Sequence, residues 1–272
     1  MANNPAPNPS SVPPPPPFPW RPWAIGAVVL AILWWSAADT GVSVEAFREG
    51  FPDLMEYFGR LLPTASDPWP LDYLPEIQGR LLETIKIALG ASIIGAALAL
   101  PYALVGAQNL AATRWVYLLG RGFLNLIRTI PDLVLASLLA AVFGAGPLAG
   151  MLALVIYTFS IVAKLLCDTV ETIDPGPMES ITAAGGTRVE RALYAVFPQV
   201  GPDFAAYALY AFEINVRAAA VLGLVGAGGI GIILLRDIRF FAYDRVGLII
   251  FVTFLIVLVI DSFSTWLRGK LV

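Results

Sequence analysis

The residues with the clearest chemical potential lie in an apolar stretch, residues 212–225, "FEINVRAAAVLGLV". Glu213 and Arg217 are four residues apart with the acid first, which is the favourable order for an ion pair on one helix face. Asn215 falls between them on another face. Ionisable groups are costly in such surroundings, so they are candidates for a functional role in which Arg217 offers its guanidinium fork to an oxyanion. The alternative is a self-neutralising pair that only helps helices to pack.

A second cation, Arg128, stands ahead of Pro131 in "RTIPD" and is a further candidate for an anion pathway. It could instead anchor a helix at the membrane interface, or pair with Asp132 four residues later. Two lysines, Lys86 and Lys164, are expected to snorkel at helix ends. Asp261 is expected to cap an interfacial turn of the last helix.

The composition argues against a catalytic site or a metal site in this chain. The chain has no histidine and a single cysteine, Cys167. Ser/His/Asp and Cys/His catalysis therefore cannot be assembled, the usual zinc and transition-metal sites are not expected, and no intrachain disulfide can form. The net charge of −3 offers no basic surface to nucleic acid. We expect no catalytic residue, no metal, no cofactor held by this chain and no nucleic-acid partner.

The composition of most of the chain is typical of a protein embedded in a lipid bilayer. It is 58% hydrophobic and 14% charged, whereas a soluble domain carries about 25% charged residues. Several apolar stretches approach the roughly 20 residues that cross a bilayer as a helix. The predicted fold class is therefore all-α, a polytopic membrane protein with about six transmembrane helices. The expected spans are residues 23–38, 87–107, 127–143, 151–168, 204–225 and 246–267.

The first part of the chain divides into a tail and a membrane segment. Residues 1–22 contain ten prolines and predict a disordered, proline-rich tail. Residues 23–79 are expected to hold a first transmembrane helix and an amphipathic helix, "VEAFREGFPDLMEYFGRLL", at the membrane surface. "WWSAAD" resembles a signal-peptidase site, but a retained first helix is the preferred interpretation because signal peptides rarely follow such a tail.

A glycine cluster follows the fifth span. Gly226, Gly228 and Gly231 have the spacing of a dinucleotide-binding fingerprint, and Gly229 adds to the cluster. No βαβ pattern surrounds it, however. A helix running unbroken over residues 204–235 would be about 48 Å long, against a hydrocarbon core of about 30 Å. The glycines are therefore expected to let the chain turn and pack closely against neighbouring helices.

One long polar segment interrupts the later spans, residues 175–200, "PGPMESITAAGGTRVERALYAVFPQV". Pro177 is placed to start a helix, Gly185 and Gly186 provide a bend, and Pro198 opens the next span. A polar helix–bend–helix in a short connection is expected to dock on a partner. An ordinary surface helix is the alternative.

The same segment resembles the EAA coupling loop of ABC-importer permeases. Glu179, Ala183, Gly185 and Pro198 occupy the positions of that motif, and Gly186 extends its bend, whereas Ser180 departs from it. Residues 80–270 as a whole resemble the phosphonate-uptake branch of the type I, binding-protein-dependent permeases. The stretches that carry this resemblance are "ETIKIALGASIIGAALALPYAL", "RTIPDLVLA", "FGAGPLAG", "EINVRAAAVLGLVGAGGIG", "AYDRVGLIIF" and "IDSFSTWLR".

This resemblance implies a permease domain over residues 80–270 whose coupling loop, 175–200, binds a separate ATPase. It also implies a second permease copy, two ABC ATPase subunits and an extracytoplasmic phosphonate-type binding protein as partners. Both termini would lie in the cytoplasm of a bacterial cell, with the chain in the inner membrane and the amphipathic segment within residues 23–79 on the extracytoplasmic side. The chain contains no G-x-x-x-x-G-K-[ST] motif, so ATP would be bound by the partner.

Two other functions stay open at the level of sequence. A permease of the same class could carry methionine or another small solute. A self-sufficient channel or secondary transporter is an alternative from a different class, although it would leave the coupling-type loop unexplained.

Overall fold

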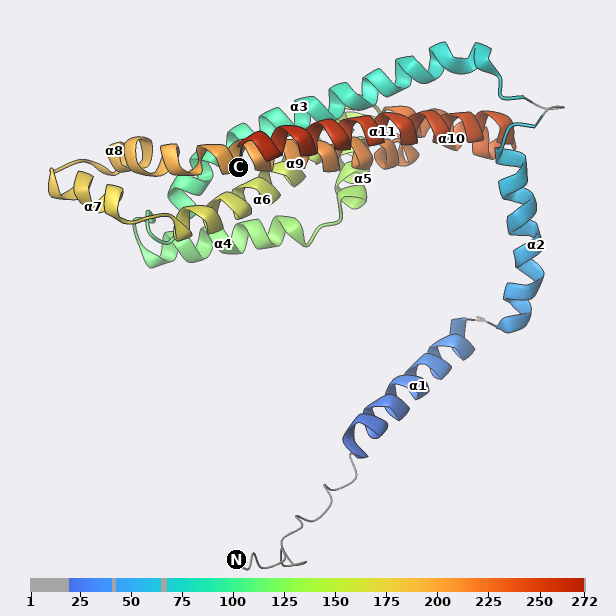
Figure 1. Ribbon diagram of the computed structural model, residues 1–272, viewed down its shortest axis with the longest axis horizontal. Coiled ribbons are helices and arrows are strands. Elements are labelled where there is room, and N and C mark those ends of the chain that lie inside the picture. Colours follow the sequence, from blue (N-terminus) through green and yellow to red (C-terminus); the bar gives the residue numbers. More distant parts are fainter. Residues whose placement is uncertain (1–19, 41–42, 65–67, 272) are drawn as a thin grey trace, which may run out of the picture. The chain divides into compact units, whose positions relative to one another are not determined.

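The computed structural model describes residues 20–40, 43–64 and 68–271, and every regular element in these ranges is a helix (Figure 1). The chain forms two compact units, residues 1–59 and 60–272, which are described separately. The predicted proline-rich tail lies outside the described residues as far as residue 19. The predicted divisions at residues 22, 79 and 270 stay predictions.

The first unit consists of two helices. Helix α1, Trp20–Thr40, is apolar and has no buried residue, as befits a helix surrounded by lipid. Helix α2, Val44–Leu61, reaches the boundary of the unit and is the predicted amphipathic helix. Its exposed apolar residues recur at helical spacing and form one stripe: Phe47, Phe51, Leu54, Met55 and Phe58.

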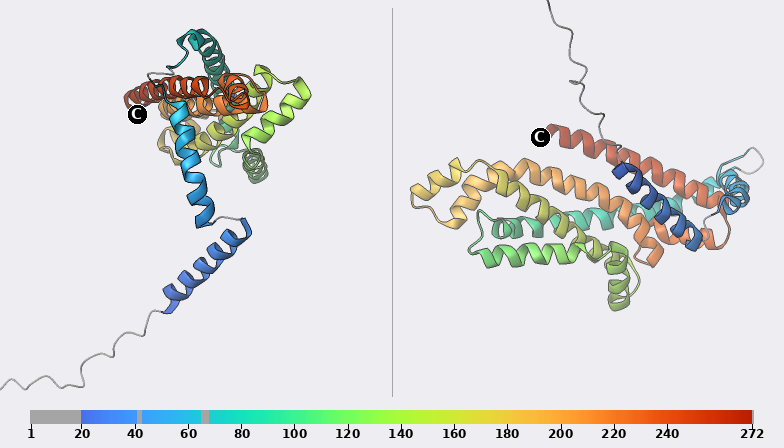
Figure 2. Two further views of the ribbon diagram at one scale, coloured as in Figure 1. Left: turned by 90° about the vertical axis from the view of Figure 1, so that its right-hand side faces the viewer. Right: turned by 90° about the horizontal axis from the view of Figure 1, so that it is seen from below.

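The second unit is a bundle of long helices that run roughly side by side (Figure 2). Its centre is α3, Leu74–Gly106, packed along much of its length against α6, Pro147–Thr172, with α9, Phe197–Leu222, against both. A short 3₁₀ turn, η2, Leu71–Tyr73, leads into α3. The last helix, α11, Tyr243–Leu271, packs on α9.

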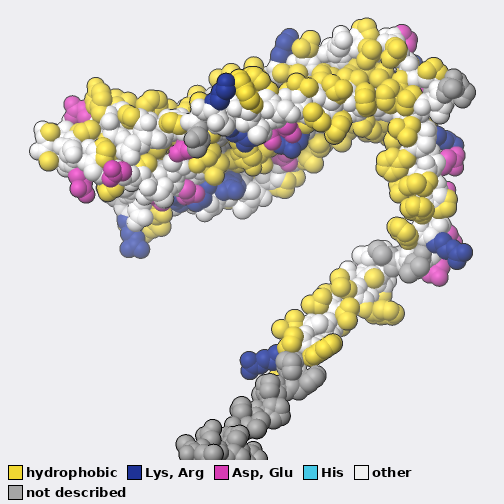
Figure 3. All heavy atoms as spheres, in the orientation of Figure 1, with side chains coloured by type: hydrophobic (Ala, Val, Ile, Leu, Met, Phe, Trp, Pro, Cys, Tyr) yellow, Lys and Arg dark blue, Asp and Glu magenta, His cyan; other side chains and the backbone are white. Residues whose placement is uncertain are grey.

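Small residues allow the central helices to approach closely. Ala88, Ala91 and Ala99 of α3 and Ala153 of α6 are fully buried, and a Cβ on Gly95 would lie 2.6 Å from Cβ of Thr158. Close contact of this kind is what holds helices together where lipid removes the hydrophobic driving force. The outer surface of the bundle is correspondingly rich in apolar side chains (Figure 3).

The number of spans agrees with the prediction, but one span has a different form. Among the described residues, five helical segments are long and apolar enough to cross a membrane, and a bent pair makes six. The pair is α4, Arg114–Arg128, and α5, Asp132–Phe143, which meet at 84°. The predicted span over residues 127–143 is therefore not one continuous helix, and a kink at Pro131 was expected near its start. Pro131 cannot donate a backbone hydrogen bond and disfavours helix at Ile130, so the chain breaks there completely and Arg128 ends α4.

The polar segment before α9 has the predicted helix–bend–helix form. Helix α7, Gly176–Ala183, ends in a bend where Gly185 has φ of +82°. Thr187 then forms a capping box with Glu190 at the start of α8, Arg188–Glu190. A π-helical turn, η3, Arg191–Val196, leads without a break into α9. This wider turn lets Pro198, which lacks a backbone N–H, lie inside a continuous helical segment.

Helix α9 ends at the glycine cluster, as the length argument requires. A 3₁₀ turn, η4, Gly223–Val225, is followed by Gly226, Gly228 and Gly229, whose φ angles are all positive at 80°, 92° and 74°. The chain then turns into α10, Ile230–Arg239. A Cβ on Gly231 would lie 2.2 Å from the carbonyl oxygen of Ala220. Glycine is required here because of close backbone approach and not because of a phosphate ligand.

This contact predicts that Gly231→Ala destabilises the protein, because the backbone of α9 or α10 must move to admit the methyl group. We expect a loss of about 1–3 kcal/mol, seen as a lower melting temperature of the purified, detergent-solubilised complex. Gly201→Ala in α9 is the matched control, since nothing lies within 4 Å of its Cβ position. Equal melting temperatures for the two variants would contradict the close packing of α9 and α10.

Candidate functional site

A cluster of four charged side chains lies where α9 meets α11. Oε1 of Glu213 accepts a hydrogen bond from Nη2 of Arg217 at 2.6 Å, and Oε2 accepts one from Nη2 of Arg268, also at 2.6 Å. Asp261 Oδ2 lies 3.8 Å from Arg217 Nη1. The cluster, which we call the charge quartet, therefore contains two guanidinium groups and two carboxylates and is neutral as a whole.

The members of the charge quartet differ in exposure. The side chain of Glu213 is 12% exposed, that of Arg268 is 28% exposed and that of Arg217 is 50% exposed. Arg217 is therefore the cation that a ligand can reach. The predicted pair of Glu213 and Arg217 exists, but it is one part of a larger arrangement.

Sequence reasoning missed the contribution of α11. Arg268 lies 55 residues from Glu213 in the chain, and no spacing rule joins the two. Asp261 was expected to cap an interfacial turn, which is wrong, because α11 runs unbroken from Tyr243 to Leu271 and Asp261 lies inside it. A charged residue within a long apolar helix was the one available signal.

Asn215 lies on the opposite side of α9 from the charge quartet. Its side chain is buried, with 1% exposure, and its Nδ2 donates to Ser92 Oγ at 2.8 Å and to Thr158 Oγ1 at 2.7 Å. These bonds join α9 to α3 and α6. Asn215 was grouped with the pathway residues, yet in this chain its side chain reaches no surface. Its geometry is that of a residue that fixes the rotation of α9.

Arg128 is the last residue of α4 and is exposed. The alternative pairing with Asp132 is not found in the described part of the chain, where Asp132 Oδ1 accepts a hydrogen bond from the backbone N–H of Leu133 instead. The 84° bend between α4 and α5 separates the two residues from the i, i+4 geometry of a helix. Arg128 therefore remains a candidate for an anion pathway.

Other charged clusters tie helices together. Arg121 of α4 bonds Asp168 at 2.7 Å and Glu171 at 2.8 Å on α6. Lys164, expected to snorkel, lies 3.4 Å from Asp168. With their cations and anions matched, these groups serve to fasten α4 to α6.

A further cluster joins α10 to the start of α3. Arg236 donates to Glu76 at 3.0 Å and to Asp237 at 2.9 Å, and it also contacts Tyr73. Asp237 is buried and accepts a hydrogen bond from the Tyr73 hydroxyl at 2.8 Å. The hydrogen bond to Asp237 raises the pKa of Arg236 above its usual value, so this arginine keeps its charge and stays paired with Asp237 and Glu76.

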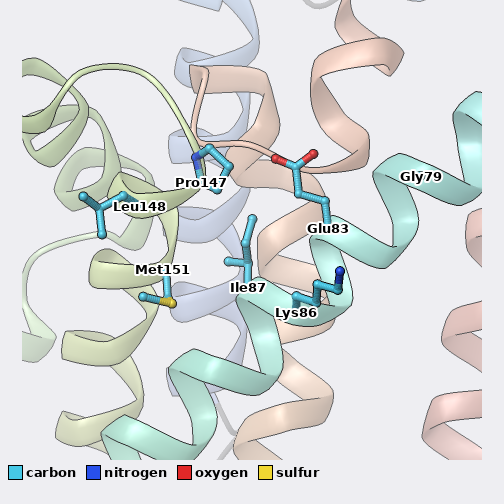
Figure 4. Close-up of a pocket in the computed structure, with 7 residues that line it drawn as sticks. All are labelled: Gly79, Glu83, Lys86, Ile87, Pro147, Leu148 and Met151. Atoms are coloured by element: carbon cyan, nitrogen blue, oxygen red, sulfur yellow. The ribbon is translucent and has the colours of Figure 1, made fainter.

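An open hollow lies between α3 and α6 (Figure 4). Ile87, Leu148 and Met151 make it apolar, while Glu83 and Lys86 project from α3 at its edge. Glu83 pairs with Arg80 at 2.9 Å. The hollow has neither the glycine-rich loop that cradles phosphates nor a set of metal ligands, and the described residues contain no group of three that could hold a metal.

The residues of the predicted coupling loop form a projection at one end of the bundle (Figure 1). Glu179 lies in the first turn of α7 and is exposed, as are Ala183 and Gly185. Gln199 holds the base of this projection through hydrogen bonds with Ala195 and Asp174. Four large apolar side chains are nevertheless exposed on it: Val189, Leu193, Tyr194 and Phe197. An exposed apolar surface on a polar projection is typical of a protein interface.

Comparison with known proteins finds one family and several relatives. Residues 91–272 match the family described as "Binding-protein-dependent transport system inner membrane component". The chain is 38% identical over 215 residues to the phosphate-import permease protein PhnE of Mycolicibacterium smegmatis, covering 79% of this chain but 40% of that longer protein. It is 32% identical over 250 residues to the phosphite transport system permease protein PtxC of Stutzerimonas stutzeri, covering 92% and 89% of the two chains.

Solved structures confirm the predicted all-α permease fold. A crystal structure of an amino acid ABC transporter with histidines is similar with a TM-score of 0.61 at 21% identity, covering 74% of this chain and 96% of that one. An inward-facing structure of the MetNI methionine ABC transporter gives a TM-score of 0.65 at 18% identity, covering 74% and 98%. At sequence identities of 21% and 18%, these similarities support the fold of the chain and not its substrate.

The buried position of Asn215 predicts that Asn215→Leu weakens the packing of α9, because the hydroxyl of Thr158 loses its partner. We expect a loss of about 1 kcal/mol, since interhelical hydrogen bonds in membranes are modest in strength. The melting temperature of the solubilised complex should fall. Asn125→Leu, the same substitution at an exposed position of α4, should leave it unchanged. If Asn215→Leu melts like the wild type, the three-helix contact is not what holds α9.

Proposed function

Because this chain belongs to the family of binding-protein-dependent transport system inner membrane components, we propose that it is the permease subunit of an ATP-driven importer for phosphonate or a related phosphorus oxyanion. It is a multi-pass protein of the inner membrane and forms the translocation pathway. The observation that carries the choice of substrate is the half-exposed guanidinium of Arg217 in a largely apolar span. Arginine binds phosphorus oxyanions through paired, charge-assisted hydrogen bonds.

The relatives support this class of substrate. The two relatives described above, which match 79% and 92% of this chain, carry names that refer to phosphate and phosphite transport. A shorter relative, the putative cryptic phosphonate transport system permease protein PhnE2 of Escherichia coli, is 46% identical over 118 residues. Phosphate, phosphite and phosphonates share a tetrahedral anionic head, which Arg217, and Arg128 at the end of α4, would attract.

In the proposed coupling mechanism, the partner binds the projection formed by residues 175–200. Glu179, Ala183, Gly185, Gly186 and Pro198 match the coupling motif, and the exposed Val189, Leu193 and Tyr194 give a partner an apolar contact. We infer that an ABC ATPase binds here, that ATP is bound by this partner alone, and that the permease itself catalyses no reaction. A second copy of this chain, two ATPases and an extracytoplasmic binding protein complete the proposed importer, with both termini of the chain in the cytoplasm.

The test of substrate class is uptake of labelled anion by cells that express the chain with its ATPase and binding protein. Unlabelled alkylphosphonate, phosphate and phosphite should compete, and methionine should not. Competition by methionine would favour the permease for a small organic solute. Uptake that persists when the ATPase is inactivated would favour a self-sufficient transporter.

Arg217→Ala is expected to abolish uptake while the complex with the ATPase still assembles. The substitution removes the exposed cation but leaves Glu213 paired with Arg268, so α9 and α11 stay in contact. Initial rates of uptake and the yield of co-purified ATPase measure the two effects. Arg114→Ala, which removes an exposed arginine at the start of α4, is the control and should transport normally. Normal uptake by Arg217→Ala would remove Arg217 from the pathway.

Gly185→Asp is expected to uncouple the importer. Residues other than glycine rarely adopt a φ of +82°, and the new carboxylate would lie at the proposed ATPase contact. The complex should hydrolyse ATP without uptake, or fail to retain the ATPase on purification. Ala112→Asp adds the same charge to an exposed loop outside the projection and should keep coupled transport. Coupled transport by Gly185→Asp would count against docking at this bend.

A further inference from the structure

The charge quartet gives one carboxylate two cationic partners, which a pair within one helix would not require. Arg217 and Arg268 each bond a different oxygen of Glu213 at 2.6 Å. Only Arg217 is half-exposed, whereas Arg268 is 28% exposed. Two cations thus share one anion, and a ligand has ready access to only one of them.

We propose that Arg268 is a positioning residue, which keeps Glu213 neutralised so that Arg217 can exchange this carboxylate for a phosphorus oxyanion. The inference rests on the proposed function. Arg217 would bind the passing anion, and Arg268 would remain with Glu213 throughout.

The energetic reason is the cost of an unpaired carboxylate in a poorly solvated place. If Glu213 had a single partner, an anion that drew Arg217 away would leave the Glu213 charge uncompensated, and the two anions would repel each other. With Arg268 in place, Oε2 of Glu213 keeps its hydrogen bond when Oε1 is released. The exchange then replaces one charge-assisted hydrogen bond with another.

The surroundings of Arg268 fix it to Glu213. Its Nη2 also lies 3.3 Å from Thr265 Oγ1 on the same helix, and its guanidinium carbon lies 5.8 Å from the centre of the Tyr210 ring on α9. Arg217 has a looser second contact, the 3.8 Å separation from Asp261. Arg268 therefore has two further contacts besides Glu213, whereas Glu213 is the one close partner of Arg217 among the described residues.

Glu213 also limits how tightly Arg217 binds an anion, because the carboxylate competes for the same guanidinium group. A transport site benefits from such competition, since an anion held too firmly would not be released. In this arrangement Arg268 is needed only while Glu213 is charged, and this condition can be tested directly.

The experiment compares variants of the complete complex, this chain with its ATPase and binding protein, in proteoliposomes. The readout is the rate of uptake of labelled phosphate, phosphite or methylphosphonate, whichever the wild type carries, at saturating binding protein. Arg268→Gln is expected to lower this rate about tenfold, as for the loss of one charge-assisted hydrogen bond. The double variant Glu213→Gln, Arg268→Gln is expected to recover to within about threefold of the wild type, because no carboxylate then needs neutralising.

Two further variants make the test decisive. Lys270→Gln removes a cation two residues along α11 that lies over the Trp266 ring, and it should transport normally. Glu213→Gln alone is the reference for the double variant: adding Arg268→Gln to it should change the rate less than about threefold, because no carboxylate then needs neutralising, and this comparison holds even if Arg268→Gln alone fails to assemble. A further fall in rate of about tenfold when Arg268→Gln is added to Glu213→Gln, in a fully assembled complex, would overturn the inference.

The remaining outcomes distinguish the possible failures. A double variant as inactive as Arg268→Gln would show that Arg268 contacts the anion or serves only packing. Wild-type rates in Arg268→Gln would show that Glu213 needs no second cation. A wild-type complex that carries none of the three anions would refute the proposed function, which is a different result from normal uptake without the expected rescue.

Discussion

Close packing of α3 against α6 is the contact on which the other features of the second unit depend. Lipid offers no hydrophobic driving force between helices, so small residues and interhelical hydrogen bonds must hold them. Gly95 and the buried alanines let α3 and α6 touch, and Ser92 and Thr158 then present hydroxyl groups to the same residue of α9, Asn215. Residues two positions away on a helix are rotated by about 200°. Fixing Asn215 inward therefore turns Glu213 and Arg217 toward α11 and the opposite face.

The lipid surroundings also determine how the charged groups of the described helices are paired. A charge that leaves water without a partner is strongly destabilised. Arg121 is matched by Asp168 and Glu171, and Arg217 and Arg268 are matched by Glu213 and Asp261. The Arg121 cluster and the charge quartet differ in how exposed their arginine side chains are. Arg121 is 11% exposed and has a close carboxylate partner at each of its Nη nitrogens, whereas Arg217 is half-exposed and has one close partner and one distant partner. Only the second arrangement can bind a ligand without breaking a buried network.

Local patterns predicted much of this architecture because they depend on local physics. Apolar length predicted five of the spans, Pro177 predicted the start of α7, and the Gly185–Gly186 pair predicted the bend after it. Local reasoning failed where the outcome depends on three-dimensional neighbours. The apolar stretch of residues 127–143 read as one helix, but Pro131 breaks it. Arg268 belongs to the charge quartet only because α11 returns alongside α9, a pairing that no spacing in the sequence encodes.

The glycine cluster shows why spacing needs a structural context. Gly226, Gly228 and Gly231 have the spacing of a nucleotide-binding turn, yet Gly231 lies against the backbone of α9 and Gly228 lies against Pro147 of α6. Both settings need glycine for the same physical reason, the approach of other atoms to a bare backbone. In a nucleotide-binding turn those atoms are phosphate oxygens, whereas here they are other helices. The cluster ends α9 shortly after Arg217, so the cation stays on a helix of fixed rotation while the chain turns into α10. The glycines thus contribute to the site by ending the helix that carries it.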